Sequence, residues 1–123
     1  MTIQGKPISF IATVNSDESR YFYEKVLGLQ CLSDDQFALA FDLGNSTLRI
    51  QKVESIPDIQ YTVLGWEVPD IRKCVEELSL KGVRFEKFPQ LPQDESGIWA
   101  APGGASIAWF KDPDCNTLSL TEL

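Results

Sequence analysis

The chain repeats one pattern of elements, which restricts it to folds built from two similar halves. Residues 47–50 (TLRI) and 117–120 (TLSL) are two versions of a Thr-Leu-x-aliphatic strand, and each follows a turn of small or polar residues. The apolar end of an earlier strand lies 14 residues before a glycine in both halves, from Val14 to Gly28 and from Val68 to Gly82. Such internal similarity at a fixed spacing predicts a duplicated unit.

The first half reads as a strand, a helix and two more strands. Residues 8–14 alternate in character, which is typical of a strand whose apolar face, here Ile8, Phe10, Ala12 and Val14, meets a helix. Asn15 or Ser16 can cap a following helix that ends at Gly28. Residues 36–43 and 46–53 predict two strands joined by a hairpin turn.

The second half repeats this order with a long insertion. Residues 61–68 predict a strand, and Asp70 caps a helix that ends at Gly82. Residues 86–106 are rich in proline and glycine, which favours a functional loop or lid, with a surface loop as the plainer interpretation. The turn Asp112-Pro113-Asp114 then leads into a last half-buried strand.

Length and composition limit the function classes. The 123 residues fit one domain, made of repeats over about residues 6–54 and 60–123. A net charge of −7 argues against nucleic acid and anionic membranes as partners. No apolar run is long enough to span a membrane, and we expect a cytoplasmic protein. The chain has no histidine, and its three cysteines lack metal-site spacing.

Two motifs carry a resemblance to a known family. Val14, Ser19, Phe22-Tyr23 and Val26-Leu27-Gly28 form the first motif, and F-K-D-P-D-x-N at residues 110–116 forms the second. Together they resemble the vicinal oxygen chelate superfamily of glyoxalases, bleomycin-resistance proteins and extradiol dioxygenases. The resemblance implies an α+β fold in which two βαβββ modules form an incomplete barrel around a cavity, with the helices outside. It also implies a homodimer.

Enzymes of that superfamily hold a divalent metal through side chains of both modules. The equivalent positions here are Ser9 (or Ile8, with a shifted gap), Arg49, Val63 and Ser119. None is a normal ligand, and Arg49 would repel a cation. We therefore expect no metal and no cofactor, and we expect these four side chains on the face opposite the helices. The superfamily usually has glycine where this chain has Cys115, so a positive φ there would be strained.

The candidate site residues follow from strand parity and from side-chain type. Tyr61, Val63, Gly65 and Glu67 are expected on one cavity face. We hypothesise that Arg49 and Glu67 orient a polar group of a ligand, although they could equally form an internal ion pair. Trp99 and Trp109 are candidates for aromatic walls, with core packing as the other interpretation of Trp109. Including the four positions above, the candidate ligand-binding set is Ser9, Arg49, Tyr61, Val63, Glu67, Trp99, Trp109 and Ser119.

Three functions compete. The favoured one is a metal-free protein that sequesters a small neutral or cationic organic molecule, as bleomycin-resistance proteins do. The second is a metal-independent lyase or isomerase acting on a carbonyl compound, with Glu67 as base and Arg49 stabilising an enolate-like charge. The third is a degenerate member of the superfamily that acts by protein association. The sequence favours binding over catalysis.

Overall fold

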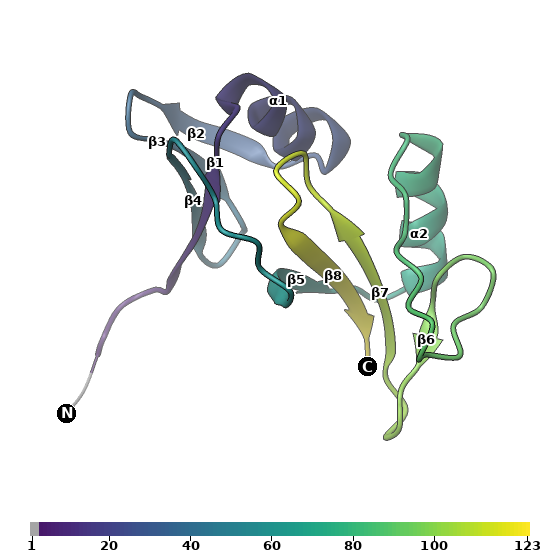
Figure 1. The fold of residues 1–123 in the computed structure, drawn as a ribbon. Coiled ribbons are helices and arrows are strands. Elements are labelled where there is room, and N and C mark those ends of the chain that lie inside the picture. Colours follow the sequence, from purple (N-terminus) through teal and green to yellow (C-terminus); the bar gives the residue numbers. More distant parts are fainter. Residues whose placement is uncertain (1–2) are drawn as a thin grey trace. The chain divides into compact units, whose positions relative to one another are not determined.

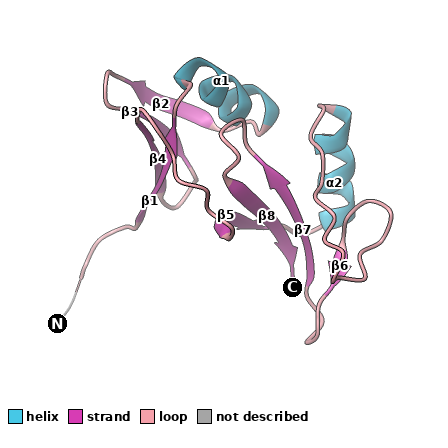
Figure 2. Ribbon diagram, in the orientation of Figure 1, coloured by secondary structure: helices cyan, strands magenta, loops and turns pink. Residues whose placement is uncertain are grey.

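A computed structural model of the protein describes residues 3–123. The chain folds into two compact units, Met1–Asp58 and Ile59–Leu123. The boundary after Asp58 lies between the two predicted repeats. Each unit combines one four-stranded sheet with one helical region (Figure 2). The predicted α+β class, with two βαβββ modules, is confirmed. Among residues 3–123, no helix has the length and apolar character needed to cross a membrane.

The N-terminal unit contains a mixed sheet with strand order β1-β4-β3-β2 (Figure 1). Parallel pairing joins β1 to β4, and the remaining pairs are antiparallel. The helical region between β1 and β2 is an α-helix followed by a π-helical turn. The elements are β1 (Ile8–Thr13), α1 (Ser16–Tyr21), η1 (Phe22–Val26), β2 (Gln30–Asp34), β3 (Ala38–Asp42) and β4 (Thr47–Lys52).

The C-terminal unit repeats this topology with strand order β5-β8-β7-β6. Here β5 pairs in parallel with β8, and α2 packs against β7 and β8. The repeated order explains why both modules carry a Thr-Leu-x-aliphatic strand in the same place, at β4 and β8. The elements are β5 (Thr62–Glu67), α2 (Ile71–Leu80), β6 (Trp99–Ala100), β7 (Ser106–Lys111) and β8 (Thr117–Glu122).

Both helical regions begin at their predicted caps and end just before the predicted glycines, although the first changes from α1 to the π-helical η1 after Tyr21. The Asn15 side chain accepts a hydrogen bond from the Glu18 amide at 3.2 Å, and Asp70 accepts one from the Lys73 amide at 3.1 Å. Gly28 and Gly82 follow the helices with φ of 78° and 95°, a conformation that glycine adopts without strain. The caps fix the ends of the helices. The side chains that hold α2 on its sheet are buried, and they are Ile71, Val75 and Leu78.

The helix-facing side of the first sheet differs from the predicted one. Ile11 and Thr13 are the buried side chains of β1, whereas Ile8 and Phe10 are 51% and 54% exposed. The register pairs Ser9 with Leu48, a core residue with no exposed surface, so Ser9 shares the helix-facing side. The predicted apolar face of β1 is therefore wrong, because alternation alone does not say which of two partly apolar faces meets the helix.

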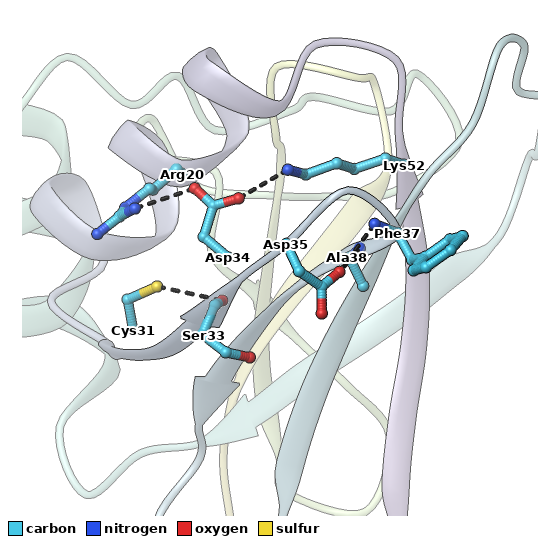
Figure 3. A network of polar contacts seen from close by, with 8 residues as sticks. All are labelled: Arg20, Cys31, Ser33, Asp34, Asp35, Phe37, Ala38 and Lys52. Carbon is cyan, nitrogen blue, oxygen red and sulfur yellow. Dashed lines mark hydrogen bonds and ion pairs between the residues drawn. The ribbon is translucent and has the colours of Figure 1, made fainter.

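Residue-by-residue alternation also failed to identify β2. Nearly all its side chains are exposed, and the register with β3 shifts between Cys31 and Ser33. An edge strand of this kind has no regular apolar alternation to detect. Asp34 at its end pairs with Arg20 of α1 at 2.9 Å and with Lys52 of β4 at 2.7 Å (Figure 3). Hydrogen bonds from these two cations lower the pKa of the Asp34 carboxyl.

The turn between β7 and β8 is organised by the side chain of Asp112. Its Oδ1 accepts hydrogen bonds from the amides of Asp114 and Asn116, both at 2.9 Å, and its Oδ2 accepts one from the Asn116 amide side chain at 2.9 Å. Asp112 and Asn116 are both 5% exposed. Cys115 lies between them with φ of 65°, as its place in a glycine position predicts.

Candidate functional site

A pocket of about 390 Å³ lies in the C-terminal unit, at the end of the sheet where β5 begins. Its walls come from the segment before β5, from three strands and from the start of the insertion. This volume is within the range of small-molecule sites. The lining residues are Ile59, Gln60, Tyr61, Thr62, Glu86, Phe88, Gln90, Leu91, Trp109, Lys111 and Thr117.

The strand part of the pocket is the open face of the sheet, opposite the helix. Thr62 lies beside Thr117, and Thr117 lies beside Lys111, so these residues form one row across β5, β8 and β7. Their neighbours Leu118 and Phe110, with no exposed surface, point to the core side instead. The row presents two hydroxyls and an ammonium to the pocket.

An aromatic group forms another wall. Trp109 is two residues before Lys111 on β7 and therefore lies on the same face. The Phe88 ring meets it edge to face, with centroids 5.4 Å apart and planes at 88°. Trp99 lies along the strand pair with its ring centroid 6.0 Å from that of Trp109. With Tyr61 and Leu91, the Phe88 and Trp109 rings give the pocket apolar surface for a flat organic molecule, and Trp99 packs behind them outside the lining.

The side chain of Gln93 holds the loop that carries Glu86 and Phe88. Its Oε1 accepts a hydrogen bond from the Phe88 amide at 2.7 Å. Its Nε2 donates to the carbonyl oxygens of Glu86 at 2.9 Å and Gly97 at 2.7 Å. On the other side, the Glu86 amide donates to the Trp109 carbonyl at 2.8 Å. The start of the predicted functional insertion is thus fixed against β7 as a pocket wall.

Asp94 organises the next turn of the same insertion. Burial alone would raise the pKa of its carboxyl, but hydrogen bonds from the Ser96 hydroxyl, the Ile98 amide and Arg72 outweigh burial and lower the pKa to about 2. The bond from the Ser96 hydroxyl is 2.7 Å long, and Arg72 of α2 lies at 3.2 Å. Asp94 is therefore a structural residue of the insertion.

Register relationships place the predicted residues of the C-terminal unit on two rows of the open face. Ser119 lies between Gly65 and Trp109 in one row, next to the pocket row. A second row ends with Glu67 on β5 and Trp99 on β6, with Thr121 and Ile107 between them. Glu67 and Thr62 pair with Thr121 and Thr117, which are four residues apart on β8, about 13 Å at the usual rise per residue. Neither Glu67 nor Ser119 nor Trp99 lines the pocket.

A bulge changes the parity predicted for β5. The register with β8 shifts between Thr62 and Leu64, so Val63 has no paired partner. Gly65 and Glu67 keep the open face, but Thr62 joins them in place of Val63. One inserted residue reverses the alternation on one side of a bulge. Tyr61 is among the residues that line the pocket, whereas Val63 is not.

The predicted residues of the N-terminal unit are on opposite sides of its sheet. Arg49 lies beside Phe10 and Ala40 on the open face, and Ser9 lies on the helix-facing side. Among residues 3–58 the Arg49 guanidinium forms no ion pair. The pairing of Arg49 with Glu67, which belongs to the other unit, stays a prediction.

The side chains at the family's metal positions do not fit a divalent cation. Arg49 is a cation, Val63 has no donor atom, and Ser9 lies on the helix-facing side of its sheet. Across residues 3–123, no three Cys, Asp or Glu side chains are grouped closely enough to hold a metal ion.

Solved structures of several proteins match nearly the whole chain. A member of the glyoxalase/bleomycin resistance protein/dioxygenase superfamily from Sphaerobacter thermophilus matches with a TM-score of 0.78 and 20% identity over 98% of both chains. The chain has the glyoxalase/bleomycin-resistance fold. At 20% identity this similarity establishes the fold alone. It confirms the fold that the two sequence motifs predicted.

Other proteins with this fold differ in what they do. TnmS3, an antibiotic binding protein from a Streptomyces species, matches with a TM-score of 0.73 and 18% identity over 99% of this chain and 98% of its own. Lactoylglutathione lyase from Agrobacterium tumefaciens matches with 0.74 and 15% identity over 94% and 90%. No protein-family model and no curated protein matches the chain. The fold alone therefore does not choose between binding and catalysis.

Several pocket residues were missed by sequence reasoning. Lys111 and Thr117 flank the Asp112 turn, and strand parity with Trp109 and Ser119 was the signal that could have found them. Phe88 and Leu91 lie in the insertion, which was predicted to be functional only as a whole. Their approach to β7 depends on the Gln93 hydrogen bonds, which no local pattern announces.

Proposed function

We propose that the chain binds a small organic molecule in the pocket of the C-terminal unit, without a metal, and acts by sequestering it. The observation that carries the proposal is the pocket of about 390 Å³, whose lining combines the aromatic side chains of Tyr61, Phe88 and Trp109 with six polar or charged side chains. Concave sites that combine apolar and aromatic walls with polar groups are typical of small-molecule binding. The fold shared with an antibiotic binding protein supports it.

Catalysis receives less support from the same geometry. The lyase or isomerase hypothesis assigns the base to Glu67 and charge stabilisation to Arg49, and the pocket lining includes neither. A catalytic base must come within hydrogen-bond reach of the proton that it removes. Glu67, about 13 Å along the sheet from the pocket row, does not meet this condition for a ligand held there. The homodimer and the cytoplasmic location remain predictions.

The test is the thermal unfolding midpoint of the purified protein with chelator present and with a library of drugs and metabolites. A ligand at about 100 times its dissociation constant adds roughly 2.7 kcal/mol, which raises the midpoint of a domain of this size by several degrees. We expect some organic compounds to raise the unfolding midpoint in the presence of chelator, and we expect Trp109→Ala to abolish this rise.

Trp66→Phe is the matched control, because Trp66 lies beside Leu120 on the helix-facing side and outside the pocket. It should keep the ligand-induced rise. If a divalent metal is needed for any rise, or if Trp109→Ala keeps the full rise, the proposal is wrong.

A further inference from the structure

Two opposite charges line the pocket without partners in their own unit. Glu86 and Lys111 both belong to the lining, yet they form no ion pair with each other. The ion pair of the C-terminal unit joins Arg72 and Asp94 instead, in the adjoining loop. The charged groups of Glu86 and Lys111 are therefore available to a bound molecule.

The backbones of both residues are held in place. Lys111 lies in β7 opposite Thr117. Glu86 is fixed on two sides, since its amide donates to the Trp109 carbonyl at 2.8 Å and its carbonyl accepts from Gln93 at 2.9 Å. Binding a ligand between their charged groups then orders two side chains and no backbone, which lowers the entropic cost of recognition.

The two charges differ in their surroundings. Lys111 ends the row that contains the hydroxyls of Thr62 and Thr117, and an ammonium with two hydroxyls matches the acceptor oxygens of a carboxylate. The Glu86 carboxylate belongs to the segment that also carries Phe88, and it accepts only. A ligand amine suits it. Trp109 is a neighbour of both charged residues: its carbonyl accepts the hydrogen bond from the Glu86 amide, and it precedes Lys111 by two residues on β7.

From these positions we propose that the ligand is a zwitterion with a flat aromatic ring, whose carboxylate meets Lys111 and whose ammonium meets Glu86. This inference rests on the proposed function and names its ligand class. A singly charged aromatic compound would pair with only one of the two pocket charges and would therefore gain one charge-assisted contact fewer than a zwitterion. A zwitterion pairs both charges and brings no net charge into the pocket.

The test compares three probes that share one ring: tryptophan, tryptamine and indole-3-propionate, titrated by calorimetry at low salt with chelator. Tryptophan should bind at least tenfold more tightly than either singly charged probe. Lys111→Gln should remove its advantage over tryptamine, and Glu86→Gln its advantage over indole-3-propionate. Lys87→Gln makes the same change of net charge as Lys111→Gln at an exposed residue outside the lining, and it should preserve both advantages of tryptophan.

Equal affinities for the three probes, or no binding of any of them at millimolar concentration, would overturn the inference. The proposed function has a separate readout. If a singly charged library compound binds best and Trp109→Ala abolishes that binding, the pocket is the site and the zwitterion is wrong. If Trp109→Ala changes no binding at all, both proposals are wrong.

Discussion

Gly65 of β5 lies beside Ser119 of β8, and a Cβ atom at Gly65 would overlap the Ser119 Oγ. The Ser119 carbonyl oxygen would be 3.3 Å from the same Cβ. The serine side chain therefore occupies the space that glycine leaves on the open face. Gly65 is needed here for close approach rather than for its backbone, because it has no positive φ.

Gly65→Ala should lower the free energy of unfolding by about 1 kcal/mol, because Ser119 must rotate and its carbonyl cannot move away. In a Ser119→Ala background the same change should be neutral or slightly stabilising, since alanine restricts the unfolded chain. Urea unfolding of the four variants in a double-mutant cycle measures this coupling. Equal effects in both backgrounds would refute the contact.

Cys115→Gly should raise the free energy of unfolding by about 1 kcal/mol. Cys115 has φ of 65°, and side chains of L-residues are strained in this conformation whereas glycine is not. Urea unfolding provides the measurement. Cys115→Ser is the control: it removes the thiol and keeps the strain, so its stability should stay near that of the parent. A similar gain in both variants would assign the effect to the thiol instead.

Ser19→Ala should leave stability unchanged or raise it by up to about 1 kcal/mol. The Ser19 hydroxyl has no exposed surface, and no hydrogen-bond partner for it is found within the described chain. Removing an unsatisfied buried hydroxyl removes a desolvation cost, and alanine favours the helix. Asn15→Ala in the same helix should act oppositely and cost about 1 kcal/mol, because it removes the N-cap. A clear loss for Ser19→Ala would show that the hydroxyl is bonded.

Sequence patterns predicted the parts of the fold that depend on local chemistry. The caps at Asn15 and Asp70 and the buried faces of β4 and β8 follow from neighbouring residues, and the structure confirms them. The face of β1 was not predictable in this way. Thr13 is buried because its hydroxyl accepts a hydrogen bond from the Asn15 amide at 3.1 Å, which makes a polar residue acceptable in the core.

The pocket depended on features that act over a distance. The bulge at Val63 reverses the parity of β5, and its register is set by pairing with β8, which lies more than 50 residues later. Strand alternation puts Trp109 on the face opposite the buried Phe110, but it does not predict that the Phe88 ring packs against Trp109. Strand parity put Arg49, Trp109 and Ser119 on the open face of their sheets, but it misplaced Ser9 on β1 and Val63 at the bulge.

Acid should weaken the insertion through Asp94. Its folded pKa, about 2, lies below the ordinary value of 3.8, so its ionised form stabilises the fold above the ordinary value. That contribution is lost as the pH falls from about 4 to about 2. Asp94→Asn should therefore show a smaller loss of thermal midpoint between pH 5 and pH 2.5 than the parent, with a lower midpoint at pH 7. Parallel curves would show that Asp94 does not contribute.

Gln93→Ala should reduce ligand binding at the pocket although Gln93 is not among the residues that line it. Three hydrogen bonds from this side chain hold the Glu86 and Phe88 backbone beside β7, and losing them frees the aromatic wall. We expect at least a tenfold loss of affinity for any compound that binds in a Trp109-dependent way, and about 2 kcal/mol less stability.

Gln90→Ala is the matched control for Gln93. Gln90 lines the pocket and is exposed, and within the described residues its side chain forms no hydrogen bond that holds the loop, so stability should change by less than about 0.5 kcal/mol. Calorimetric titration gives the affinity and urea unfolding the stability of each variant. If Gln93→Ala loses stability but keeps full affinity, the wall formed by residues 86–91 contributes nothing to binding, and Tyr61 and Trp109 must hold the ligand without it.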